Sequence, residues 1–181
     1  KMIGEDNWVS KHPPHREVGI VVSAGPYLDC VALKEFMHTY LARGIRPKIL
    51  AVKHAYPNLL KNGIIPWGCI VLDPRSIEGK STHNIVRKDL FKDINKETLF
   101  FVASMTDPSV TKHIRDGNGK IWGWHAFTDF MRQEQERGTQ IINQTVQLNE
   151  ELGIPQGATL ITGGTCAAMR GIGLMHTMGF R

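Results

Sequence analysis

The chain has 181 residues, of which 41% are hydrophobic and 22% are charged, as expected for a single globular domain. The net charge of +5 suits an anionic ligand, but the basic residues form no run of the kind that marks a nucleic-acid-binding arm. No stretch approaches the roughly 18 apolar residues of a membrane span, and no signal-peptide pattern opens the sequence. We therefore expect a soluble, cytoplasmic protein that binds neither nucleic acid nor membranes.

Apolar runs alternate with helical patterns, which predicts βαβ units around a mainly parallel sheet. The expected strands are Val18–Ser23, Pro47–Lys53, Cys69–Leu72, Thr98–Ala103, Lys120–Trp124 and Ala158–Thr162. The expected helices are Val31–Arg43, Tyr56–Asn62, one that begins at Asp107 and Pro108, Asp129–Leu152 and Thr165–Met178. The segment Asp129–Leu152 is either one long helix or two helices broken at Gly138. The polar and basic segment 75–96 is expected to lie at the surface with a short helix. A doubly wound sheet would add a strand after the last helix, so we expect the sheet to lack its last strand.

Residues 1–16 contain two adjacent prolines and are predicted to form a flexible or surface-lying leader, followed by one domain over 17–181. His12 and His15 have a spacing that could hold a metal ion, but we expect a solvated pair and predict no metal site.

Three cysteines, Cys30, Cys69 and Cys166, lie far apart, each in or beside an apolar segment. This pattern predicts buried, reduced thiols, which agrees with a cytoplasmic location.

Two glycine turns join a predicted strand to a predicted helix. In an α/β sheet such turns lie at the carboxyl ends of strands, where free helix N–H groups can bind phosphate. Two of them in one domain predict a nucleotide or another phosphorylated ligand, although either could be an ordinary strand-to-helix turn. We expect the two turns to converge, so that Gly25 and Gly164 contact the same ligand. The residues expected to bind it are Ser23, Gly25, Pro26 and Tyr27 in the first turn, and Thr162, Gly163, Gly164 and Thr165 in the second.

The first turn does not fit the dinucleotide-binding fingerprint, which needs three spaced glycines and an acidic residue after the second strand. Here Gly25 is followed by Pro26, and the second strand ends in Lys53 and His54. Lysine and histidine suit a phosphate or carboxylate and do not suit ribose hydroxyls. We therefore expect neither NAD nor S-adenosylmethionine, and Lys53 joins the residues expected to bind the donor.

Polar residues also follow the other strands. Asp73 could bind a divalent metal or orient a hydroxyl, or it could simply form an Asp-Pro turn. It is also a candidate catalytic residue, because either Asp73 or His125 could take the proton of the acceptor. Ser104 follows the fourth strand at the same edge and is another candidate for donor binding. His125, expected just past the fifth strand, is the candidate general base because imidazole titrates near neutral pH. Asp29 is expected to cap the first helix, and Asp107 is expected to cap the helix that begins with Pro108.

Three motifs, in order along the chain, resemble the MptE-like family. This family includes 6-hydroxymethylpterin diphosphokinases and the central domain of bacterial motility accessory factors. The first motif, Gly25-Pro26-Tyr27-Leu28-Asp29, is similar to the family signature G-P-S-L-D. The second comprises 59–66 and 70–74, which are similar to a leucine-rich helix, a G-I-x-P-D motif and a strand ending in D-P. The third, 162–168, is similar to a G-G-S-V-A turn, and the resemblance covers roughly 18–181.

The resemblance implies a Rossmann-like three-layer α/β domain that handles a nucleotide-activated donor. One branch of the family transfers nonulosonic sugars from a cytidine nucleotide to flagellin, and another transfers diphosphate from ATP to a pterin alcohol. By the same resemblance Gly25 and Pro26 would form the donor turn and Asp73 the acid in the middle of the sheet. Gly163, Gly164 and Thr165 would make the second phosphate or sugar contact.

Departures from the family pattern favour glycosyl transfer. Tyr27 replaces the usual serine, and Lys53, His54 and Arg75 stand near positions where the diphosphokinases carry aspartates that would hold Mg²⁺. We therefore expect a transferase that uses a sugar nucleotide. A 6-hydroxymethylpterin diphosphokinase and a non-catalytic nucleotide-binding domain remain alternatives. The cofactor is open, with Mg²⁺ as a candidate companion of the nucleotide, and an oligomer is compatible with the sequence.

Overall fold

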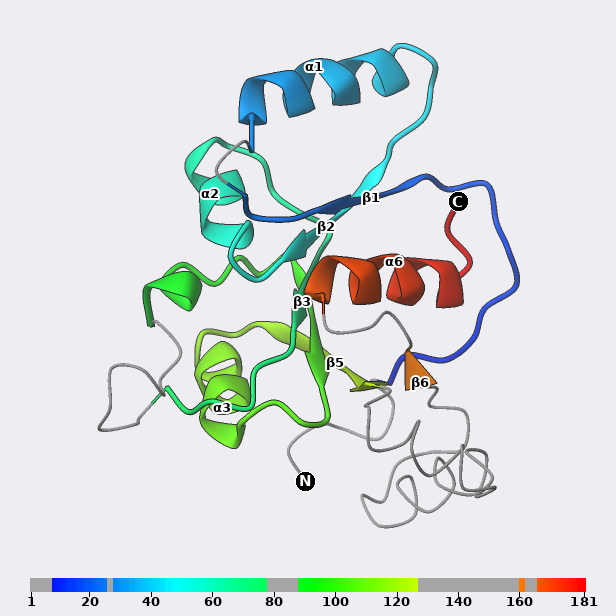
Figure 1. The fold of residues 1–181 in the computed structure, drawn as a ribbon. Helices are drawn as coiled ribbons and strands as arrows, with labels where there is room; N and C mark the ends of the chain where they lie inside the picture. Colours follow the sequence, from blue (N-terminus) through cyan, green and yellow to red (C-terminus); the bar gives the residue numbers. More distant parts are fainter. Residues whose placement is uncertain (1–7, 26–27, 78–87, 127–159, 162–165) are drawn as a thin grey trace.

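The computed structural model describes residues 8–25, 28–77, 88–126, 160–161 and 166–181. Its centre is a sheet of six strands whose order in space follows their order along the chain (Figure 1). Every neighbouring pair is parallel. The strands are β1 (Gly19–Val22), β2 (Lys48–Val52), β3 (Gly68–Val71), β4 (Leu99–Ala103), β5 (Lys120–Ala126) and β6 (Leu160–Ile161).

Helices cover both faces of the sheet. One face carries α1 (Cys30–Leu41), α2 (Tyr56–Lys61), α3 (Pro108–Asp116) and the 3-10 helix η1 (Lys88–Phe91), and the other carries α6 (Ala167–Thr177) (Figure 1). Strand β4 is buried on both sides, with Phe100 and Val102 in one core and Phe101 and Ala103 in the other. The protein is thus a Rossmann-like three-layer α/β domain, and the predicted fold class is confirmed.

Each described strand lies beside the next strand in the chain, so the order of the strands never turns back across the sheet. A right-handed crossover from each strand to the next places the connecting helices on the same face, which accounts for the positions of α1, α2 and α3. Helix α6 packs against β1, β2 and β6, although β1 and β6 are the two outermost strands. A flat sheet would hold these strands about 24 Å apart at the usual strand spacing, so the sheet twists and curls around α6.

Both predicted aspartate caps are present. The Asp29 carboxylate accepts the N–H groups of Val31 and Ala32 at 2.8 and 3.1 Å and begins α1. Asp107 accepts the N–H of Ser109 at 2.9 Å and precedes a proline at the first position of α3. These bonds satisfy N–H groups that have no partner within a helix.

Residues within the predicted leader contact the domain. The Val9 N–H donates to the Gly123 oxygen at 2.8 Å, and the Val9 side chain is buried. Farther along, the His15 N–H donates to the Gly179 oxygen at 2.9 Å. The leader boundary at residue 16 stays a prediction, but residues 8–15 lie against β5 and the end of α6.

The last residue also lies against the sheet. The Arg181 N–H donates to the Glu17 oxygen at 3.1 Å, and the Gly19 N–H donates to the Arg181 oxygen at 3.0 Å. This alternation is the pattern of a parallel ladder. These two hydrogen bonds lie on the side of β1 that faces away from β2.

Two of the predictions about burial fail in the described residues. The segment 75–96 does not lie wholly at the surface, because Ile77, Leu90 and Phe91 are buried in the core under α2 and α3. Apolar residues scattered in a basic segment gave too weak a signal to predict this. Cys166 is exposed, whereas Cys30 and Cys69 are buried as predicted.

The predicted helix Asp129–Leu152 lies outside the described residues. None of the helices that the structure describes is long and apolar enough to cross a membrane.

Candidate functional site

The carboxyl ends of the parallel strands bring the described candidate residues to one edge of the sheet. Ser23 and Gly25 follow β1, Lys53 follows β2, Asp73 follows β3 and Ser104 follows β4. The other predicted turn residues lie outside the described residues: Pro26, Tyr27, Thr162, Gly163, Gly164 and Thr165.

A buried carboxylate with two basic partners lies at the centre of this edge. Asp73 is 2% exposed, and its Oδ2 is contacted by the Lys53 Nζ. Arg75 binds the same carboxylate through two bonds, from Nε to Oδ1 and from Nη2 to Oδ2, each 2.8 Å long. The Arg75 backbone N–H adds a bond of 3.1 Å to Oδ1. Two adjacent strand ends therefore meet in one ion cluster.

This cluster carries a surplus of positive charge. Burial alone would raise the pKa of Asp73, but hydrogen bonds from Arg75 and Lys53 outweigh it and hold that pKa well below its usual range. One carboxylate against two cations leaves a net charge of +1 on the three side chains. The Arg75 side chain is 46% exposed and Lys53 only 12%, so the free side of the guanidinium faces solvent. An anion is the ligand that this charge favours.

The first glycine turn is less suited to phosphate than its sequence predicts. The Asp29 carboxylate occupies the N–H groups at the start of α1, and the Leu28 N–H donates to the Gly25 oxygen at 3.1 Å. A negative side chain thus stands where a phosphate would bind. A pocket of about 420 Å³ beside the turn has mostly apolar walls, formed by Ile20, Val21, Val22, Ser23, Gly25, Leu28 and Leu33.

The predicted convergence of the two glycine turns is not tested by the described residues. The turns follow β1 and β6, which lie at opposite edges of the sheet. Helix α6 packs against both strands, and so it links these edges. A cradle shared by Gly25 and Gly164 stays a prediction.

The predicted general base lies inside a strand. The sequence placed His125 just past the fifth strand, but β5 continues to Ala126 and His125 is 1% exposed. Its Nδ1 lies 2.9 Å from the Ser104 Oγ, and Ser104 is exposed. The ring of Trp8 packs on the imidazole with centroids 5.0 Å apart. Sequence reasoning missed Trp8, because no local pattern connects an N-terminal residue with β5.

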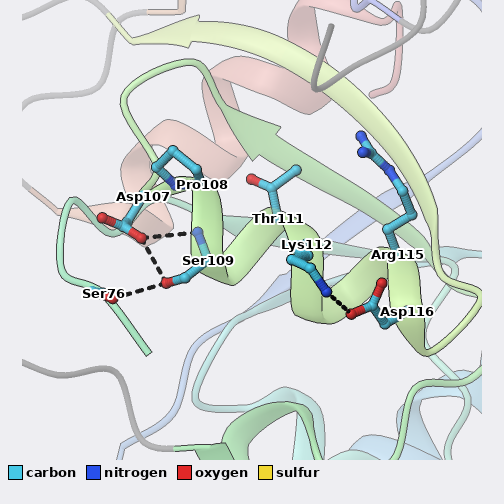
Figure 2. Close-up of a pocket in the computed structure, with 8 residues that line it drawn as sticks. All are labelled: Ser76, Asp107, Pro108, Ser109, Thr111, Lys112, Arg115 and Asp116. Carbon is cyan, nitrogen blue, oxygen red and sulfur yellow. Dashed lines mark hydrogen bonds and ion pairs between the residues drawn. The ribbon is translucent and has the colours of Figure 1, made fainter. Parts of the chain in front are cut away.

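A second pocket, also missed, lies along α3 (Figure 2). It has a volume of about 680 Å³ and is lined by Ser76, Asp107, Pro108, Ser109, Thr111, Lys112, Arg115 and Asp116. Figure 2 shows Asp107, Ser109 and Ser76 joined by hydrogen bonds at one end. The spacing of Pro108, Thr111, Lys112 and Arg115 on one helix face was the signal in the sequence that could have revealed it.

The described residues contain no preformed site for Mg²⁺. Among them no group of three or more histidine, cysteine or acidic side chains is placed to hold a metal ion. Both oxygens of Asp73, the buried acid of the edge, already accept hydrogen bonds from cations. Magnesium prefers carboxylates that are free to bind it.

No family model matches the chain, and no curated protein matches its sequence.

Proposed function

We propose that the protein is a transferase that binds the phosphate groups of a nucleotide-activated donor at the carboxyl edge of its sheet. The observation that carries this proposal is the Lys53–Asp73–Arg75 cluster, in which a buried carboxylate orients two cations at adjacent strand ends. Ligands of parallel α/β sheets bind outside the carboxyl ends of the strands. Arginine and lysine held there would stabilise the charge that develops on a departing phosphate.

The cluster suggests different roles for its members. Asp73 has a lowered pKa and two cationic partners, so it is a poor base and serves to position Lys53 and Arg75. Proton acceptance from the acceptor hydroxyl falls to His125 acting with Ser104. The proposal therefore favours His125 over Asp73 as the base.

The proposed donor is a sugar nucleotide of the nonulosonic-acid type. This choice rests on the MptE-like resemblance and on the poor fit of Mg²⁺ to the described residues, since transfer of diphosphate from ATP normally depends on that ion.

Isothermal titration with CMP, CDP, UDP and ATP, each with and without Mg²⁺, tests the proposal. We expect one or more of them to bind without Mg²⁺, and we expect the substitutions Lys53→Met and Arg75→Met each to weaken binding about tenfold or more. The matched controls are Lys120→Met, at the amino end of β5, and Arg46→Met, just before β2. Both remove a positive charge at the opposite edge of the sheet and should leave binding unchanged.

The alternatives give different results. Binding of ATP that requires Mg²⁺, with AMP release in the presence of a hydroxymethylpterin, would support the diphosphokinase instead. Nucleotide binding without turnover of any activated donor would support a non-catalytic domain. No heat from any nucleotide, or equal losses in the test and control variants, would refute donor binding at this cluster.

A further inference from the structure

The Ser104–His125 pair joins an exposed hydroxyl to a buried imidazole. Ser104 and His125 are neighbours at the ends of β4 and β5, and the Ser104 N–H donates to the Trp124 oxygen at 2.9 Å. This bond fixes the backbone of Ser104 while its Oγ stays 2.9 Å from the His125 Nδ1. Because His125 is only 1% exposed, a ligand at this edge meets the hydroxyl rather than the imidazole.

The imidazole of His125 is held in place by Trp8, which precedes it by more than a hundred residues in the chain. Trp8 forms an isolated parallel bridge with Gly123 and stacks on His125. A Cβ at Gly123 would lie 2.7 Å from the Trp8 ring, so glycine provides the space for the indole. A ring confined in this way loses little further freedom when it takes up a proton from its neighbour.

Positive charge lies next to the serine along the edge. The β3–β4 register pairs Val71 with Val102, and Asp73 and Ser104 each follow two residues later, at the same end of neighbouring strands. The backbone bond from the Asp107 N–H to the Asp73 oxygen, 2.9 Å long, ties the two strand ends together. The cations on Asp73 therefore lie at the same edge of the sheet as Ser104, and their charge favours an anionic electrophile there.

We propose that Ser104 is a nucleophilic serine, activated by His125, that takes up an activated phosphoryl group. In this step the Ser104 Oγ bonds to phosphorus, its proton passes to the His125 Nδ1, and the bond from phosphorus to the leaving group breaks. The leaving group departs with the electron pair of that bond. The product is a phosphate ester of Ser104. The required co-reactant is a phosphoric anhydride or another phosphoryl compound with a good leaving group.

This inference goes beyond the proposed function, because donor binding at Lys53 and Arg75 requires no covalent adduct. The proposal for Ser104 and the proposal for donor binding can therefore fail separately. Replacement of Ser104 by alanine removes the attacking oxygen and should abolish the adduct, whereas donor binding at the cations is tested separately by Lys53→Met and Arg75→Met, which leave the Ser104 hydroxyl in place.

A fluorophosphonate probe tests the nucleophile directly. Attack by Ser104 releases fluoride and leaves a phosphonyl group whose mass and position are read by mass spectrometry of the digested protein. We expect labelling at Ser104 in the wild type, none at that position in Ser104→Ala, and labelling about a hundredfold slower in His125→Asn. Asparagine places an amide near the former Nδ1 but accepts no proton. The matched control is Ser109→Ala, which removes a hydroxyl bonded to the Asp107 carboxylate at 2.6 Å and should not change the rate.

A second variant covers the case in which His125→Asn does not fold. Trp8→Ala leaves the imidazole and the serine unchanged and removes only the ring that confines them, so we expect labelling to slow about tenfold. Labelling of Ser104 that slows in these variants supports the proposal. An unlabelled Ser104 in the folded wild type would overturn it, and so would a rate that stays the same in a folded His125→Asn or Trp8→Ala variant.

Discussion

Arg75 binds both carboxylate oxygens of Asp73, each at 2.8 Å, while the Lys53 Nζ contacts Oδ2. A paired arginine and carboxylate of this geometry hold each other in one orientation. The carboxylate is buried and cannot exchange its partners for water, so its charge is tied to both cations. Removal of that charge should lower the free energy of unfolding and change how this free energy depends on pH.

We expect Asp73→Asn to lower the free energy of unfolding at pH 7 by about 3 kcal/mol, because it leaves Lys53 and Arg75 without their buried counter-charge. Urea denaturation measures the change. The control is Asp116→Asn on α3, which breaks an exposed pair with Lys112 and should cost about 0.5 kcal/mol or less. Similar losses in the two variants would show that the buried cluster is no more important than a surface pair.

The stability difference between the wild type and Asp73→Asn should depend on pH in one direction. The pKa of Asp73 is lowered on folding, so its contribution is fully present above the unfolded pKa of about 3.9 and is lost as pH falls below it toward the folded value. Thermal unfolding of both proteins between pH 7 and pH 2 should therefore give curves that converge at the acid end. A difference that stays constant across this range would contradict the lowered pKa.

Cys166 should react faster than the other two cysteines. It is exposed, and the backbone N–H groups of Met169 and Ala168 at the start of α6 lower the pKa of its thiol. Burial raises the pKa of Cys69, and Cys30 is buried as well. Alkylation with iodoacetamide at pH 7, followed by peptide mass mapping, should modify Cys166 first. Equal modification of all three in the folded protein would refute this, and urea-unfolded protein is the control.

Gly179→Ala should loosen the N-terminal segment. Gly179 has φ +87°, and a Cβ there would lie 2.3 Å from the Pro13 carbonyl oxygen, a backbone atom that cannot turn aside. We expect a loss of about 2 kcal/mol in unfolding free energy and faster proteolysis near residue 13. The control is Gly44→Ala, with φ +74° and no atom within 4 Å of the added Cβ, which carries only the backbone strain. If both variants are cleaved at the same rate, the contact with Pro13 does not hold the segment.

Local sequence signals predicted the parts of the fold that depend on neighbours in the chain. The caps Asp29 and Asp107 and the buried strand β4 follow from residue type and from an apolar run, and all three are present. The edge of the sheet that carries Lys53 and Asp73 followed from the parallel strands alone.

Contacts between distant segments could not be predicted in this way. His125 looks like a residue that follows a strand, and its burial depends on Trp8, which no periodicity relates to it. The pairing of Lys53 with Asp73 depends on side-chain reach between two strand ends, which the order of residues does not encode. The burial of Cys166 was predicted wrongly because α6 begins at Ala167, one residue after Cys166. The thiol therefore lies outside the packed face of the helix.

The bonds of Val9 with Gly123 and of Glu17 with Arg181 have a kinetic consequence. Each closes a loop of more than a hundred residues, and the chain entropy of such a closure is lost before the contact can stabilise anything. The inner strands β2, β3 and β4 need much shorter closures. In refolding, these strands should gain protection from hydrogen exchange early, and the backbone amides of Val9, Gly19 and Arg181 should gain it last.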